Sequence, residues 1–234
     1  MSARSVPHSG PLAPRVGDQA TRDRLLSVAA HRFAEHGFAR VSVRDICRDA
    51  HANVAAVNYH FGGKTGLYQA VMDAAIGTMQ ATTAAARDAG AGLDGRQRLA
   101  AFVRTFVHRV VGLRRESWIH QLMMRELSDP TPMLDRVASD VLRPRLSYLC
   151  QAMADATGMR PDHPAVIRSA VSLTSQFHGL IWGEIMRKVA PGYEPAPERL
   201  EEIADHITRF SLGGLAAVLQ PAAADSGRAS GRPV

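Results

Sequence analysis

The stretch between Ser42 and Lys64 (SVRDICRDAHANVAAVNYHFGGK) constrains the fold of this chain more than any other segment. Ser42 and Asn53 are residue types that cap the N-termini of helices, and each precedes a short apolar-periodic run. Gly62 follows the second run and is a residue type that ends helices. Two helices of roughly eight residues, joined by a turn of about three or four, have helix-turn-helix geometry. The sequence therefore predicts this motif.

A supporting helix is expected immediately before the motif. Apolar residues recur at three- and four-residue spacing after Thr21, which we expect to be the N-cap, and Gly37 is expected to end the helix. Phe38 and Val41, in the connector to the motif, are expected to pack inwards. Residues 1–20 are rich in Ser, Pro, Gly and Arg, so we expect a disordered, mildly basic arm. This arm is either a simple terminus or a segment that reaches a nucleic-acid groove.

Further helical patterns follow, without strand alternation or internal repeats. A Gly-rich segment at 89–95 is the clearest break in composition, and Pro144 is expected either to kink or to split its helix. Residues 221–234 are expected to form a disordered tail. The chain is therefore expected to be all-α. The later helices are predicted over residues 64–88, 96–113, 115–127, 133–157, 165–189 and 198–219.

The charge distribution points to an anionic partner. Residues 1–65 contain nine basic and five acidic side chains, so most of the formal net charge of +6 lies in the first quarter of the 234 residues. Cys47 and Cys150 have no spacing typical of a disulfide framework or metal site, so we expect the protein to reside in a reducing compartment. No apolar run has the length or position of a signal peptide or membrane span. We therefore expect a cytoplasmic protein without a cofactor.

Several motifs lie in register between residues 21 and 75. They are FAEHGF at 33–38, SVRDI at 42–46, YHF at 59–61, Lys64 and the Leu67-Tyr68 pair. With these motifs the segment resembles the TetR/AcrR family of bacterial transcriptional regulators. Residues 52–62 most resemble the CecR-type subgroup, and residues 125–132 are similar to the C-terminal domain of that subgroup.

The resemblance implies an Ω-shaped homodimer with one DNA-binding head per protomer. Helices 165–189 and 198–219 would form a four-helix dimer interface, and the central helices would enclose a pocket for a small-molecule inducer. The function implied is a ligand-responsive regulator, expected to be a repressor released from a palindromic operator, with activation left open. The expected domains are an arm (1–20), a TetR-type helix-turn-helix domain (21–68), a helical ligand-binding and dimerisation domain (69–220) and a tail (221–234).

The motif also suggests which residues contact DNA. Phosphate contacts are expected from side chains with charge or hydrogen-bond donors, and base contacts from the second helix of the motif. Competing interpretations are that Asn58 faces solvent, that His60 packs internally and that Lys64 is a surface lysine without a DNA contact. His51 occupies a turn position where Gly is common because φ can be positive. The phosphate set is Ser42, Arg44, Tyr59, His60 and Lys64; the base set is Val54, Ala55, Ala56 and Asn58.

A second candidate site lies in the larger helical segment, where rings, thioethers and polar tips are mixed. Such a mixture suits a pocket for an aromatic or amphiphilic compound, although ordinary core or dimer interface would also explain it. Arg125 and Glu126 are expected to form a surface pair. Cys47 is expected to be a buried structural thiol, with redox sensing as the alternative. The pocket candidates are Trp118, His120, Met123, Met124, Phe177, His178 and Trp182.

Two other function classes compete with this interpretation. An enzyme would use a cluster drawn from His120, Glu126, His163 and His178, but their spacing matches no metal-ligand motif, so neither catalytic nor metal-binding residues are expected. A constitutive architectural DNA-binding protein would need no ligand. The length of the C-terminal segment argues against it, and a thermal-shift screen without any stabilising compound would favour it.

Overall fold

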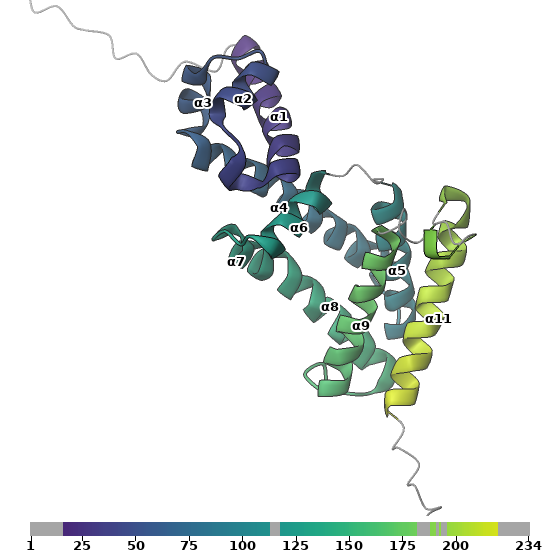
Figure 1. The fold of residues 1–234 in the computed structure, drawn as a ribbon. Helices are drawn as coiled ribbons and strands as arrows, with labels where there is room; N and C mark the ends of the chain where they lie inside the picture. Colours follow the sequence, from purple (N-terminus) through teal and green to yellow (C-terminus); the bar gives the residue numbers. More distant parts are fainter. Residues whose placement is uncertain (1–15, 113–117, 182–187, 191, 193–195, 220–234) are drawn as a thin grey trace, which may run out of the picture. The chain divides into compact units, whose positions relative to one another are not determined.

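The computed structural model describes residues 16–112, 118–181, 188–190, 192 and 196–219, and within these residues it contains helices and no strand (Figure 1). The all-α fold is therefore as expected. The elements in chain order are α1 (Val16–Arg40), α2 (Val43–Asp49), α3 (Val54–Phe61), α4 (Lys64–Ala89), α5 (Gly95–Gly112), α6 (Trp118–Ser128), α7 (Met133–Val137), the π-helical turn η1 (Ala138–Leu142), α8 (Arg143–Thr157), α9 (Pro164–Ile181), the short 3₁₀ turn η2 (Pro197–Arg199) and α11 (Leu200–Leu219).

The start of α1 corrects the sequence prediction. The helix begins at Val16, so residues 16–20 are helical rather than part of a disordered arm. Thr21 is not the N-cap, because its hydroxyl donates to the Gly17 carbonyl one turn earlier, at 2.9 Å. Gly37 does end the regular helix, with φ 78° and ψ 165°. The rest of the expected arm, residues 1–15, and the expected tail lie outside the described residues.

The chain divides into two compact units. Of the described residues, those up to Ala75 and Trp118–Leu134 form the first unit, called the head here, and the described residues between Ile76 and Ser117 and from Asp135 onwards form the second, the body. Helix α4 contributes to both units. Helix α6 belongs to the same unit as the N-terminal helices, although its residues are far from theirs in the sequence.

An aromatic cluster forms the centre of the head. The Phe33 ring meets Tyr68 edge to face at 5.0 Å, and Phe38 lies 4.9 Å from Tyr68 and 6.1 Å from Phe33 between ring centroids. Val41 is also buried. The prediction that Phe38 and Val41 pack inwards is therefore confirmed, and the connector between α1 and α2 is held by the core.

The body has its own core, built by α5, α8, α9 and α11 (Figure 1). Phe102 and Phe106 are stacked with centroids 4.5 Å apart, and Phe177 lies 5.1 Å from Phe106. Phe177 is thus a core residue of this unit. The other buried members include Leu99, Val103, Leu149, Met153, Val166, Leu173 and Leu215.

The helical run around Pro144 is divided into α7, the π-helical turn η1 and α8. Proline lacks an N–H group, which leaves the carbonyl of Asp140 without its helical donor. The Gln80 side chain on α4 supplies a replacement and donates to the Asp140 carbonyl at 3.2 Å. The Arg143 N–H bonds to Ala138 five residues earlier, so the turn widens to π geometry and continues into α8.

Both cysteines are buried and free. Burial raises the pKa of the Cys47 thiol and of the Cys150 thiol. Because the thiolate is the reactive form, both environments favour a structural role over redox sensing. This agrees with the interpretation of Cys47 from sequence.

The junction of α5 and α8 gives a stability prediction. A Cβ at Gly95 would lie 2.4 Å from the Ala156 nitrogen and 2.6 Å from the Ala152 carbonyl oxygen, whereas a Cβ at Gly77, inside α4, meets no heavy atom within 4 Å. Gly95→Ala should therefore cost about 1–3 kcal/mol of unfolding free energy by forcing backbones apart. Gly77→Ala should add about 0.5–1 kcal/mol through helix propensity.

Urea denaturation of the two variants, each against the wild type, measures both effects. Equal effects at the two glycines would contradict the close packing of α5 on α8.

Candidate nucleic-acid interface

The first helix of the motif, α2, starts at a well-defined cap. The Ser42 hydroxyl accepts a hydrogen bond from the Asp45 backbone N–H at 3.1 Å and donates to the Asp45 carboxylate at 2.6 Å. The predicted N-cap is confirmed. Because its proton is already donated within the helix, Ser42 contributes mainly by fixing where α2 begins.

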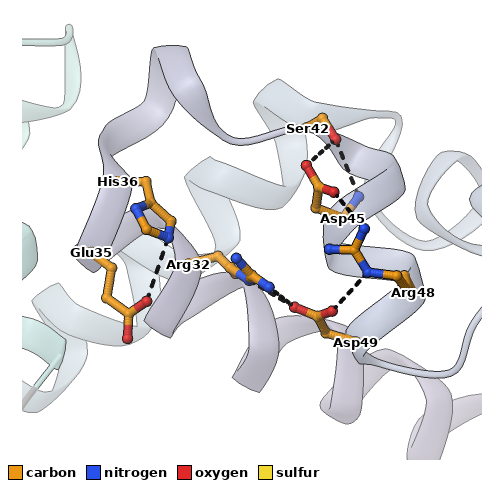
Figure 2. A network of polar contacts seen from close by, with 7 residues as sticks. All are labelled: Arg32, Glu35, His36, Ser42, Asp45, Arg48 and Asp49. Carbon is orange, nitrogen blue, oxygen red and sulfur yellow. Dashed lines mark hydrogen bonds and ion pairs between the residues drawn. The ribbon is translucent and has the colours of Figure 1, made fainter.

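A polar network holds α2 against α1 (Figure 2). The Arg32 Nε donates to Asp49 Oδ2 at 2.7 Å, and its Nη2 makes a second, shorter contact with the same oxygen. Arg48 donates to Asp49 Oδ1 at 3.3 Å and lies 3.0 Å from Asp45 Oδ1. The hydrogen bond from Arg32 holds the pKa of Asp49 below its ordinary value, and the bond from Ser42 does the same for Asp45.

The turn between α2 and α3 has the backbone conformation that the sequence implied. His51 has a φ of 49°, and it is the one non-glycine residue in the described ranges with a positive φ. The Ala52 N–H donates to the Cys47 carbonyl at 2.9 Å and closes the turn. His51 therefore occupies, with some strain, a position that glycine adopts freely.

The second helix, α3, is delimited as predicted. Asn53 caps it by accepting from the Ala55 N–H at 2.9 Å, and Gly62, with a φ of 70°, ends it. The Gly62 N–H donates to the Asn58 carbonyl at 3.0 Å. Val57 has no exposed surface and faces the head core, as expected. The burial of Val57 therefore determines which other positions of α3 face away from the head core.

One face of α3 is exposed. Val54 and Asn58 are one turn apart, as are Ala55 and Tyr59, and all four are exposed. Tyr59 is the most prominent, with 76% of its surface exposed. Ala56 is half-buried at the edge of this face. The structure thus brings most of the base-contact candidates together on one surface.

Two of the predicted phosphate-contact residues are tied to the head instead of projecting freely. His60 has a side chain only 8% exposed, and its Nε2 lies 3.1 Å from Asp18 Oδ1 on α1. The Lys64 ammonium donates to the Ala39 carbonyl at 3.3 Å and lies 4.6 Å from the centroid of the Phe38 ring. Neither tie was visible in the sequence, because both partners lie on a distant segment.

Two arginines without a partner in the described part of the head lie close to Ser42 in the sequence. Arg44 is exposed, and within the described residues it has no hydrogen-bond, ion-pair or ring partner. The same holds for Arg40, at the end of α1, a residue that sequence reasoning missed. Its place two residues before the cap could have suggested it. Other arginines of the head are engaged internally, such as Arg32 with Asp49 and Arg22 over the Phe61 ring at 5.3 Å.

Arg125 and Glu126 do not form the expected surface pair. The Arg125 Nη2 donates to the Glu35 carbonyl of α1 at 2.6 Å. Glu126 is only 1% exposed and accepts hydrogen bonds from the Tyr68 hydroxyl and from Thr131, whose N–H lies 3.2 Å away. A buried carboxylate requires such donors. Burial, followed by the contact with Glu126, raises the pKa of Tyr68.

The predicted ligand-pocket residues are distributed over both units. Trp118, His120 and Met123 are half-buried on α6 of the head, where Met124 is 41% exposed. Phe177 belongs to the core of the body. The side chain of His178 and the whole of Trp182 lie outside the described residues. The pocket therefore stays a prediction.

Two of the polar groups proposed for an enzyme, Glu126 and His163, form hydrogen bonds within the fold. Glu126 is held by Tyr68 and Thr131, and His163 Nδ1 accepts from the Ala165 N–H at 3.2 Å, at the start of α9. In the part of the chain that the structure describes, no group of three or more His, Cys, Asp or Glu residues could hold a metal ion. No helix in that part is long and apolar enough to cross a membrane.

Comparisons with known proteins agree with this geometry. Residues 25–71 match the family model described as bacterial regulatory proteins of the tetR family. Residues 95–215, more than half of the chain, match the C-terminal domain of the HTH-type transcriptional dual regulator CecR. A probable HTH-type transcriptional regulator of Bacillus subtilis, YttP, is 40% identical over 50 residues, which are 21% of this chain and 24% of that protein. The match thus spans about a quarter of that relative.

Solved structures share the fold over most of their length. A TetR-like transcriptional regulator from Rhodococcus is 21% identical with a TM-score of 0.63, covering 88% of this chain and 99% of that one. A TetR-family regulator from Streptomyces coelicolor is 22% identical with a TM-score of 0.61, covering 86% and 96%. With the exposed face of α3 and the two family models, the conclusion follows: this chain belongs to the TetR family of bacterial transcriptional regulators and has a C-terminal domain of the CecR type.

Proposed function

We propose that this regulator is a ligand-responsive repressor that binds a palindromic operator as a homodimer and is released by a small-molecule inducer. The observation that carries the DNA-binding part is the exposed face of α3, with Arg40 and Arg44 uncompensated beside it. A helix of this kind fits the major groove of B-DNA. Regulation of chromosomal DNA implies a cytoplasmic location.

The contacts with DNA divide into two kinds. Arg44 and Arg40 supply charge to phosphates, with the hydroxyl of Tyr59 as a further donor, because these groups project from the head. Val54, Ala55, Ala56 and Asn58 face the bases, where the Asn58 amide can pair with the edge of an adenine. His60, Lys64 and Ser42 are proposed phosphate contacts at the margin of this surface, oriented by their bonds within the head.

Gel-shift titrations on DNA from the regulator's own promoter region test this division. Arg44→Ala should weaken binding to every sequence and reduce the slope of log affinity against log salt by about 2, because each of the two heads of the dimer loses one phosphate contact. Asn58→Ala should cost about 1–3 kcal/mol on the preferred operator and alter the ranking of operators.

Arg143→Ala, which removes an exposed arginine from α8 in the body, provides the matched control and should bind like the wild type. If Arg44→Ala and Asn58→Ala also bind like the wild type, the proposed DNA surface is wrong.

The pair of Arg32 and Asp49 should make the head sensitive to acid. Asp49 has a lowered pKa when folded, so its contribution to stability is complete above its unfolded pKa of about 3.9 and is lost as the pH falls through the folded value. Asp49→Asn should therefore lower the melting temperature of the protein at pH 7, and the difference from the wild type should shrink below about pH 4.

Thermal melts of the wild type and Asp49→Asn between pH 3 and pH 8 measure this dependence. A difference that stays constant over the whole range would show that the charge on Asp49 does not hold α2.

The homodimer proposal rests on the outer faces of α9 and α11. Both helices bury one stripe in the body core, yet Val171 on α9 is 49% exposed and Phe210 on α11 is 64% exposed. The glycines at 213 and 214 and Ala217 continue the outer face of α11 and would allow close approach of a second helix. A second copy of the chain would cover these groups, and its twofold symmetry would require a palindromic operator.

Phe210→Glu tests the interface by placing a charge in its centre. Light scattering should show monomers, and operator affinity should fall by about a hundredfold or more because the two heads no longer bind as one unit. Leu93→Glu, at an exposed apolar position in the turn before α5, should remain dimeric. A dimeric Phe210→Glu variant would place the interface elsewhere.

The contacts of α6 support ligand-dependent release. Through Arg125 this helix holds the end of α1, and through Glu126 it holds Tyr68 on α4. A ligand that moves α6 would therefore alter the head, and a coupling of about 1–3 kcal/mol would be sufficient for release. The alternative, a DNA-binding protein without a ligand, is favoured if a thermal-shift screen finds no stabilising compound.

A further inference from the structure

The body part of α4 carries a row of long polar side chains that reach η1 and α8. Gln80, Thr83 and Arg87 are spaced three and four residues apart, so they share one face of the helix. Gln80 donates to the Asp140 carbonyl, Thr83 accepts from Arg145, and Arg87 donates to the Pro144 carbonyl at 3.0 Å. Polar side chains, instead of interlocked apolar ones, thus make these connections between α4 and the helical run through α8.

Arg145 is the cation at the centre of this row. Its Nε donates to Thr83 Oγ1 at 3.1 Å, its Nη2 donates to the Met79 carbonyl at 3.2 Å, and its guanidinium carbon lies 4.6 Å from the centroid of the Phe106 ring. A guanidinium has further N–H donors beyond these two. Within the described ranges they have no acceptor, and no carboxylate forms an ion pair with Arg145.

The charge on Arg145 persists under physiological conditions. Burial lowers the pKa of Arg145 to about 10, which still leaves the group protonated at neutral pH. A part-buried cation without a counter-ion is costly for a folded protein. By contrast, Arg98 on the neighbouring helix α5 has Asp155 as its ion-pair partner. The environment of Arg145 is therefore one that an added negative charge would stabilise.

Two further features lie next to this cation. It follows the π-helical turn η1, and such turns occur frequently at functional sites. Its neighbour Phe106 is 6% exposed and stacked on the fully buried Phe102, with centroids 4.5 Å apart, so the charge lies beside the aromatic core of the body. A charge of one sign beside aromatic rings is the combination that recognises a small amphiphilic anion.

We propose that Arg145 anchors the carboxylate of an aromatic small-molecule effector, with the Phe106 ring contacting its apolar part. This rests on the proposed function as a ligand-responsive regulator and specifies the chemical class of the ligand. A carboxylate can accept two parallel hydrogen bonds from one guanidinium. It would therefore compete with Thr83 and Met79 for Arg145 and loosen the hold of α8 on α4, the helix that begins at Lys64 in the head.

The test uses 2-naphthoate and its neutral analogue 2-naphthamide as probes, with thermal-shift and calorimetric binding measurements on the full chain. 2-Naphthoate should stabilise the wild type, and 2-naphthamide should bind at least about tenfold more weakly because it lacks the charge. Arg145→Met should weaken 2-naphthoate binding by about tenfold to a hundredfold, the effect of losing one charge-assisted contact. Arg143→Gln, which removes an exposed charge from the same helix, should bind 2-naphthoate like the wild type.

Arg145→Lys provides a second measurement in case Arg145→Met does not fold. It retains the charge but not the two-pronged geometry of the guanidinium, so its affinity for 2-naphthoate should fall between those of the wild type and Arg145→Met. The proposal is overturned if 2-naphthoate fails to stabilise the wild type, if 2-naphthamide binds equally well, or if both Arg145 variants keep wild-type affinity.

A gel shift with and without 2-naphthoate separates this inference from the proposed function. Binding through Arg145 without any change in operator affinity would support the anion site and contradict ligand-dependent release. Release of the operator that survives Arg145→Met would support a ligand-responsive regulator and overturn the role of Arg145.

Discussion

The proposed DNA-binding surface depends on how two very short helices are held in place. Helix α2 has seven residues and α3 has eight, and helices of this length are not stable in isolation. The bond from Arg32 to Asp49 fixes α2 to α1, and the burial of Val57 fixes α3 to the head core. Because Val57 points inwards, the rotation of α3 is set and its opposite face must be exposed.

The arginines of the protein fall into groups with different physical roles. Arg32 and Arg48 share the carboxylate of Asp49 and so act within the head. Arg40 and Arg44 have no partner in the described parts of the chain, so their charge is available to a polyanion. Arg145 in the body is part-buried against a ring with two neutral acceptors. Counting positive charges in the sequence does not separate these roles, because each depends on which acid lies nearby in space.

Local signals in the sequence were sufficient for the helix-turn-helix motif. The N-caps Ser42 and Asn53, the stop at Gly62 and the positive φ at His51 all depend on one residue and its immediate neighbours. The same reasoning failed at Thr21, where a good capping residue lies inside a longer helix. A capping side chain favours a helix start without excluding other positions, and here the helical pattern extends back to Val16.

The sequence by itself determined the all-α class, the limits of most helices and the family, because periodicity, caps and motif residues are local properties. Tertiary structure alone decided that Glu126 is buried against Tyr68, that His60 meets Asp18 and that Arg145 lacks an acidic partner in the described residues. Each of these facts concerns a polar group whose partner, or whose lack of one, depends on residues far away in the chain. Burial and pairing of charges are properties of the folded chain, and they decide which residues are left to meet DNA or a ligand.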